Sequence, residues 1–234
     1  MRCIDSKKMG KADHGWLNSH FHFSFDQYRN PSNMNFGVLR VLNDDLVQPG
    51  TGFDLHPHQD MEIVSYVVDG ELTHKDSMGN ERTLTRGQIQ YMSAGTGVVH
   101  SEYNEGASLL RFLQIWILPD KKGYKPAYGD YAFPFGDRIG RWLPLASYYD
   151  GDVSDAPVKI HADVSIYAGV IEAGRNLAFA AGSGRQAYLV NIEGETAAGS
   201  SLLYRSDALE ITEEEVTLES KTTSHLLVIE MKKA

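Results

Sequence analysis

Short apolar runs separated by turn residues fill the stretch from Phe36 to Leu118, and they constrain the fold more than any other feature of the chain. The runs are rich in β-branched and aromatic residues, and glycine, asparagine and aspartate punctuate them, as is typical of strands joined by tight turns. The segments expected to contain strands are FGVLRVLN, MEIVSYVVDG, ELTHKD, RTLTRGQIQYMSAG, GVVHSEYN and SLLRFLQIWIL. Strands at such regular spacing predict an all-β sandwich or barrel with few helices.

The composition changes between Pro119 and Asp155, where proline, glycine and tyrosine accumulate. We expect this stretch to be a connecting segment packed by its aromatic side chains, with a domain boundary inside it. A chain of 234 residues with 42% apolar content can form one large all-β domain or two small ones. We place the two domains at residues 1–135 and 136–234.

The second half of the chain contains short segments that are similar to segments of the first half. AYLVNIEGE, residues 187–195, resembles SYVVDGE, residues 65–71, because both read as a strand entering a Gly-Glu turn. YRSDALEI, residues 204–211, follows its turn much as LTRGQIQY, residues 84–91, follows the first. We interpret the halves as divergent copies of one unit. AFAAGSGRQ stands where the first copy has histidines, so we expect no metal in the second copy.

Charge and cysteine content exclude several classes of function. The formal charge of −9 and the absence of Lys/Arg clusters longer than pairs such as Lys7-Lys8 disfavour binding to nucleic acid or anionic membranes. Cys3 is the single cysteine, so an intrachain disulfide and a thiolate metal cluster are impossible. The first residues lack the apolar region of a signal peptide, and no run reaches the ~18 apolar residues of a membrane span. We therefore expect a cytoplasmic protein.

Two pairs of potential metal ligands stand out. His56 and His58 are two residues apart, so on a strand they project to the same side with Cα atoms roughly 6–7 Å apart. An isolated H-x-H pair more often faces solvent, but His100 and Glu102 form a second such pair behind a glycine-rich bend. Three imidazoles and a carboxylate suit Fe, Mn, Co, Ni, Cu or Zn better than Ca²⁺ or Mg²⁺. Such a site would keep one or two coordination positions for a substrate or dioxygen.

The other histidines lack a paired ligand. In HFHFSF the alternating phenylalanines are expected to take the core side, so His20 and His22 should face solvent or a polar surface between domains. His74 is expected on a solvated strand face, and His161 and His225 are not expected to be ligands. The tryptophans are assigned to core or domain-interface packing: Trp16, Trp116 and Trp142.

The residues around both ligand pairs resemble a known family. GFDLHPHQDMEIVSYVVDG, residues 52–70, resembles the first cupin motif, and GQIQYMSAGTGVVHSEYN, residues 87–104, resembles the second. H-P-H-x-D-M-E-I combined with S-A-G-T-G-x-x-H-S-E, preceded by GWLNSHFHFSFDQY and NFGVLRVLNDD, is similar to the pirin family and in particular to its bacterial quercetin-dioxygenase-like members. The resemblance is close over residues 15–119 and looser to the C-terminus. Ser93 stands where the wider cupin motif has proline.

The resemblance implies a bicupin, that is, two β-barrel domains of the jelly-roll or double-stranded β-helix type. It implies one divalent transition metal in the N-terminal barrel, most often Fe(II), with Mn, Ni, Co, Cu or Zn also possible. The implied ligands are His56, His58, His100 and Glu102. In many cupins the carboxylate ligand is the glutamate of the first motif, whereas in pirins it follows the last histidine, so Glu62 is expected either to hold the ligands from behind or to be structural.

The implied activity is that of a quercetin 2,3-dioxygenase, an oxidoreductase that opens the ring of flavonols with dioxygen. Glu102 is the expected catalytic base, because it is the carboxylate predicted at the metal and the substrate hydroxyl must lose a proton. The family also implies an alternative, a non-enzymatic protein whose metal pocket senses redox state or a ligand and signals to a protein partner. A sugar-phosphate isomerase or storage cupin would need basic pocket residues or a storage-type composition, and neither is evident.

Overall fold

The computed structural model describes residues 1–149, 151 and 155–233, and strands make up most of it. The described residues contain no α-helix, only the two 3-10 helices η1 (Ser6–Lys8) and η2 (Phe135–Arg138), so the all-β prediction is confirmed. Neither of these short helices has the length or apolar character to cross a bilayer. The chain forms two compact units, Met9–Phe133 with Ile160–Ala162, and Met1–Lys8 with Pro134–Lys159 and Asp163–Ala234. We call them the N-terminal and the C-terminal barrel.

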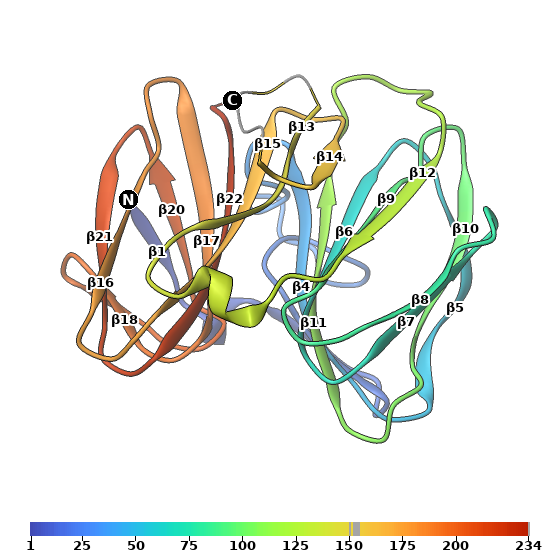
Figure 1. The fold of residues 1–234 in the computed structure, drawn as a ribbon, viewed down its shortest axis with the longest axis horizontal. Coiled ribbons are helices and arrows are strands. Elements are labelled where there is room, and N and C mark those ends of the chain that lie inside the picture. Colours follow the sequence, from blue (N-terminus) through green and yellow to red (C-terminus); the bar gives the residue numbers. More distant parts are fainter. Residues whose placement is uncertain (150, 152–154, 234) are drawn as a thin grey trace. The chain divides into compact units, whose positions relative to one another are not determined.

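The N-terminal barrel consists of two antiparallel sheets (Figure 1). The seven-stranded sheet has the order β12-β9-β6-β11-β4-β3-β2, and the four-stranded sheet has the order β5-β10-β7-β8. Their strands are β2 (Gly10–Asp13), β3 (Leu17–Phe21), β4 (Leu39–Val47), β5 (Thr51–His58), β6 (Glu62–Asp69), β7 (Leu72–Asp76), β8 (Glu81–Leu84), β9 (Ile89–Ser93), β10 (Val98–Asn104), β11 (Leu110–Ile117) and β12 (Ala127–Tyr131).

The C-terminal barrel has the same two-sheet plan. Its seven-stranded sheet has the order β1-β20-β17-β22-β15-β13-β14, and its four-stranded sheet has the order β16-β21-β18-β19. Its strands are β1 (Arg2–Ile4), β13 (Leu143–Tyr148), β14 (Val158–Ile160), β15 (Val164–Ile171), β16 (Asn176–Ala180), β17 (Arg185–Glu193), β18 (Thr196–Ala198), β19 (Ser201–Leu203), β20 (Ala208–Thr212), β21 (Glu215–Ser220) and β22 (Ser224–Lys232).

The strand orders confirm the predicted repeat. The series β9-β6-β11-β4-β3 corresponds to β20-β17-β22-β15-β13, and β5-β10-β7-β8 corresponds to β16-β21-β18-β19. The two matched sequences are β6 and β17 with the turns that follow them. Gly70 (φ 78°) and Gly194 (φ 82°) occupy these turns in the left-handed region, and a Cβ on either would strike the backbone carbonyl just before the neighbouring strand, β11 or β22. The same backbone requirement therefore explains the same glycine in both copies.

Two features of the fold differ from the sequence expectation. The first eight residues belong to the C-terminal barrel, because β1 pairs with β20, and the blue β1 lies among orange and red strands in Figure 1. The segment from Pro119 to Asp155 is also more than a connection, since β12 pairs with β9 and extends the N-terminal sheet, and β13 belongs to the C-terminal sheet. Positions 150 and 152–154 of that segment lie outside the described residues.

The core of the N-terminal barrel fills one end of the space between its sheets. Strand alternation on β4, β6 and β11 directs apolar side chains inward, and the main cluster comprises Leu17, Val47, Val67, Leu72, Leu84, Leu110 and Phe112. Polar side chains replace apolar ones two residues before Val67 on β6 and two residues after Phe112 on β11, at Ser65 and Gln114, both of which are buried. The interior of the barrel thus changes from apolar to polar at Ser65 and Gln114.

Candidate metal centre

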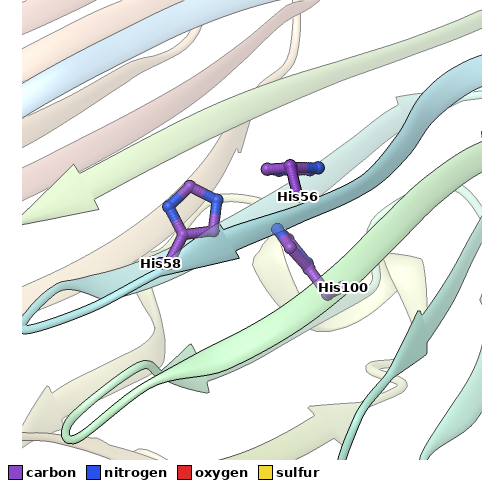
Figure 2. A group of neighbouring side chains, drawn as sticks. All are labelled: His56, His58 and His100. Atoms are coloured by element: carbon purple, nitrogen blue, oxygen red, sulfur yellow. The ribbon is translucent and has the colours of Figure 1, made fainter.

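Three histidine rings converge inside the N-terminal barrel. β5 is an edge strand, which accommodates Pro57 between His56 and His58 because an edge residue needs no ladder donor on its outer side. His100 on β10 lies directly opposite His56 in the antiparallel register. The three ring centroids are 4.4–4.9 Å apart, and one nitrogen from each ring lies within 4.8 Å of the others (Figure 2).

The protonation of His56 is set by a backbone carbonyl. Its Nδ1 lies 2.7 Å from the carbonyl oxygen of Asp54. A carbonyl oxygen only accepts hydrogen bonds, so Nδ1 carries the proton and Nε2 presents a lone pair. Such a contact on the distal nitrogen is the usual way in which a protein orients a histidine ligand.

The protonation of His100 is set through a neighbouring histidine. His74 Nε2 lies 3.1 Å from the Asp76 carboxylate, and His74 Nδ1 lies 3.4 Å from His100 Nδ1. Because the carboxylate accepts, a neutral His74 carries its proton on Nε2 and its Nδ1 must accept from His100. His100 Nε2 is then unprotonated, and this atom is buried without a hydrogen-bond partner in the described part of the chain. An orphaned buried lone pair that faces two other imidazoles is what a metal ligand requires.

The electrostatics of the site favour neutral imidazoles. Burial, reinforced by the two neighbouring histidines, lowers the pKa of His58 to about 4. Burial together with His56 and His74 lowers the pKa of His100 to about 3. Metal binding needs the unprotonated ring, so at neutral pH no proton has to be displaced from these two side chains. The three histidines therefore fit a borderline divalent transition metal.

Glu102 lies beside the histidines in a polar cluster of its own. Its side chain is 2% exposed and lies on β10 opposite His74, and a second group of possible ligand atoms joins it with His74 and His100. Oε1 accepts hydrogen bonds from Ser65 Oγ at 2.8 Å and Gln90 Nε2 at 2.6 Å, and Oε2 accepts one from Gln114 Nε2 at 2.5 Å. These donors fix the carboxylate, and Oε2 keeps one lone pair for a metal or a proton.

A cavity of about 390 Å³ reaches the site from within the same barrel. His56, Glu102 and Gln114 form part of its wall, and its volume is in the range of small-molecule sites. Five aromatic side chains also line it: Trp16, Phe21, Phe25, Phe53 and Trp116. Trp116 also contacts the ring of His58, with centroids 4.8 Å apart. Trp16 and Trp116, expected in plain packing, thus line the cavity as well.

The structure corrects the expectation for His74 and narrows that for His22. His74, expected on a solvated face, is fully buried, because β7 is an inner strand of its sheet and its side chain points toward β10. His22, expected to face solvent or a polar surface between domains, is 1% exposed and so does not face solvent, because β3 ends at Phe21 and the strand alternation stops there. Burial lowers the pKa of His22 to about 4. The sequence held one signal for a role of His74, because it stands two residues before Asp76, the same spacing as that between His56 and His58.

Glu62 supports the barrel, as expected, from a position away from the histidines. Its buried carboxylate accepts hydrogen bonds from the Tyr91 hydroxyl and the Ser93 hydroxyl, both at 2.6 Å, and from the backbone N–H of His161 at 2.9 Å. Ser93 therefore supplies a donor that the proline of the wider cupin motif could not. His161 itself stacks on Tyr124, and His225 is buried in the C-terminal barrel beside Phe135.

Comparison with known proteins assigns the chain to a family. The pirin family description matches residues 4–117, and that of the quercetinase C-terminal cupin domain matches residues 146–231. A "Pirin-like protein" of Caulobacter vibrioides is 41% identical over 231 residues, which are 97% of this chain and 99% of that protein. The chain belongs to the pirin family. This pirin is also 35% identical over 229 residues to the quercetin 2,3-dioxygenase of Escherichia coli K12, covering 97% of this chain and 96% of that one.

Solved structures agree with this assignment. The crystal structure of the bacterial pirin YhhW from Escherichia coli in complex with nickel(II) superposes with a TM-score of 0.91 at 33% identity, covering all of this chain and 99% of that one. The bicupin fold expected from the motifs is therefore confirmed for this pirin. The nickel in that relative and the histidine group in this chain support a divalent metal, without fixing which metal.

Proposed function

We propose that this pirin is a metal-dependent dioxygenase that opens the ring of flavonols such as quercetin. The observation that carries the proposal is that His56, His58 and His100 converge within metal-binding distance, and that His56 and the Glu102 carboxylate line an aromatic-walled cavity. The relatives named quercetin 2,3-dioxygenase support the same reaction class. His56, His58 and His100 are proposed as metal ligands, with Glu102 as the fourth ligand and catalytic base. Iron(II) is the expected metal, and a cytoplasmic location remains a prediction.

The aromatic walls of the cavity suit a flat, multi-ring ligand. Trp16 and Phe53 meet edge to face, as do Phe25 and Trp116, so they present both ring faces and ring edges to a bound aromatic compound. These walls also displace water, which strengthens every polar contact made inside the cavity. The divalent metal, when bound, would supply Lewis acidity and the redox chemistry that dioxygen requires.

Glu102 is suited to take the hydroxyl proton of a flavonol. Gln90, Ser65 and Gln114 hold its carboxylate from the barrel interior, which leaves the free lone pair on Oε2 as the acceptor position. A carboxylate fixed in this way needs no reorientation when the proton moves, and positioned acid–base groups typically contribute about 10²–10⁴-fold to a rate. Proton removal would convert the substrate into its enolate form, in which the negative charge is shared with a ring carbon that reacts more readily with dioxygen.

The test combines metal analysis with oxygen consumption. Gently purified protein would be analysed for metal, then stripped and reloaded with Fe, Mn, Ni, Co, Cu or Zn, and each form assayed for oxygen uptake with quercetin. We expect flavonol-dependent uptake with at least one metal and none in a His56→Ala/His58→Ala variant. A protein that binds metal tightly but turns over no flavonol in any form would overturn the enzyme proposal and favour a regulatory pirin.

A further inference from the structure

The cavity contains a polar group that the proposed reaction does not use. Ser19 on β3 and Asn43 and Asp45 on β4 line the cavity, and each is only 2–3% exposed. The register explains their arrangement, because Asp45 lies opposite Ser19 on one side, and Asn43 lies opposite Gln114 on the other. They therefore form a polar patch on the seven-stranded sheet. Gln114 connects this patch to Glu102, because it lies opposite Asn43 and donates a hydrogen bond to the Glu102 carboxylate.

The carboxyl group of Asp45 is poorly satisfied by the protein. Ser19 Oγ donates to Asp45 Oδ1 at 2.5 Å, whereas a carboxylate can accept about four hydrogen bonds. Burial, reinforced by the neighbouring charges of Asp44 and Glu102 and opposed by the bond from Ser19, raises the pKa of Asp45 to about 7. The amide oxygen of Asn43 is also buried, with no hydrogen-bond partner in the described part of the chain. Buried acceptors in this state gain free energy when a ligand supplies donors.

We propose that Asp45, held by Ser19, is a second anchor of the cavity that accepts a hydrogen bond from a ligand hydroxyl group. The inference rests on the proposed function and narrows its substrate class. Asp45 is the diagonal neighbour of Gln114 across the β4–β11 pair, at about 7–8 Å between Cα atoms, while Gln114 contacts Glu102 directly. Asp45 and the Glu102 cluster are therefore separate acceptor positions on the cavity wall. The favoured ligands are therefore aromatic compounds with hydroxyl groups at two separated positions, one at the metal centre and one at Asp45.

The test measures ligand preference without turnover. Quercetin and 3-hydroxyflavone, which lacks hydroxyl groups other than the one beside its ketone, would be titrated anaerobically into metal-loaded protein, with quenching of tryptophan fluorescence as the readout. Trp16 and Trp116 line the cavity and report occupancy. We expect wild type to prefer quercetin by about tenfold, which corresponds to one additional hydrogen bond.

Three variants make the result specific. Asp45→Leu should lose the preference by weakening quercetin binding while leaving 3-hydroxyflavone binding unchanged, and Asp45→Asn, which keeps an acceptor oxygen and the side-chain size, should lose less. Asp130→Asn is the control. It removes an exposed carboxylate on β12 that pairs with Arg82, and it should change the affinity for neither compound.

The outcomes separate the anchor from the proposed function. A wild-type preference retained by a folded Asp45→Leu, or by a folded Asp45→Ala if the leucine variant does not fold, overturns the anchor and leaves the flavonol proposal intact. Wild type that binds neither compound overturns the proposed function and the anchor with it.

Discussion

The Nδ1 atoms of His74 and His100 lie 3.4 Å apart in the interior of the N-terminal barrel. This contact continues to the Asp76 carboxylate, which is fixed in turn by the side chain and backbone N–H of Asn80. The SMGN turn thus orients a buried carboxylate, the carboxylate sets the tautomer of His74, and His74 sets that of His100. A turn at the rim of the four-stranded sheet determines which nitrogen of His100 faces the centre of the histidine group.

We predict that His74→Leu weakens metal binding by about 10–100-fold, the usual cost of losing a partner behind a histidine ligand. His100 would keep its ring but lose the acceptor for its Nδ1 proton, so its tautomer and orientation would no longer be fixed. Competition with a chromogenic chelator measures the affinity. His225→Leu is the matched control, because it replaces a buried histidine of the C-terminal barrel. Equal metal affinities for wild type and His74→Leu would contradict this prediction.

Glu102→Gln should retain metal but lose about 10²–10⁴-fold in kcat per bound metal for flavonol oxidation. The amide cannot accept the substrate proton, and its NH₂ group would face the donor amides of Gln90 or Gln114, so one of these must reorient. Steady-state rates normalised to metal content, measured across pH, test this. A substrate already ionised at high pH should partly rescue the variant. If activity falls only as far as metal occupancy falls, Glu102 is a structural ligand and not the base.

The sequence predicted the histidine trio because its signal is local. Strand alternation brings His56 and His58 to one side within three residues, and an antiparallel pairing adds His100 directly opposite. The environment of Glu102 was beyond such reasoning, because Ser65, Gln90 and Gln114 come from three strands of the seven-stranded sheet and reach Glu102 on the other sheet only when the two sheets close. His74 was missed for the same reason, since alternation shows which side a residue faces but not whether that side is interior.

The fold shows the same division between local and distant information. The paired Gly70 and Gly194 turns are local backbone requirements, and the repeat could be recognised from them. The pairing of Cys3 with Leu209 in the β1–β20 ladder joins residues at opposite ends of the chain, and no local pattern in the first eight residues predicts that pairing. Composition consequently placed the boundary near Pro134 but assigned the N-terminal strand to the other barrel.

We predict one metal ion per chain, held in the N-terminal barrel. β16 and β21 occupy the places of β5 and β10 in the C-terminal barrel, and neither carries a histidine. Metal analysis of wild type should give a ratio of one, and the His56→Ala/His58→Ala variant should bind none above background. Anomalous scattering from crystals of the loaded protein would locate the ion. A stoichiometric metal in the double variant, or a second ion in the C-terminal barrel, would refute the assignment.

The final prediction concerns the acid stability of the metal-free protein. His22, His58 and His100 have folded-state pKa values of about 4, 4 and 3 against an ordinary value of 6.5. Between those limits the unfolded chain binds more protons, so the free energy of unfolding should fall as the pH falls from 6.5 toward 4. Each proton that the unfolded chain binds and the folded chain does not changes the free energy of unfolding by about 1.4 kcal/mol per pH unit.

Asp45 should oppose this loss, because its folded-state pKa is about 7 against an ordinary 3.8, so the folded state binds the extra proton in that window. Its contribution grows as the pH falls, and Asp45→Asn removes it. The variant should therefore lose stability more steeply on acidification than wild type. Urea unfolding midpoints of both proteins, measured with chelator present at several pH values between 4 and 7, test the prediction. A shallower dependence in Asp45→Asn, or a wild type whose stability is flat in this range, would contradict the buried ionisation states on which it rests.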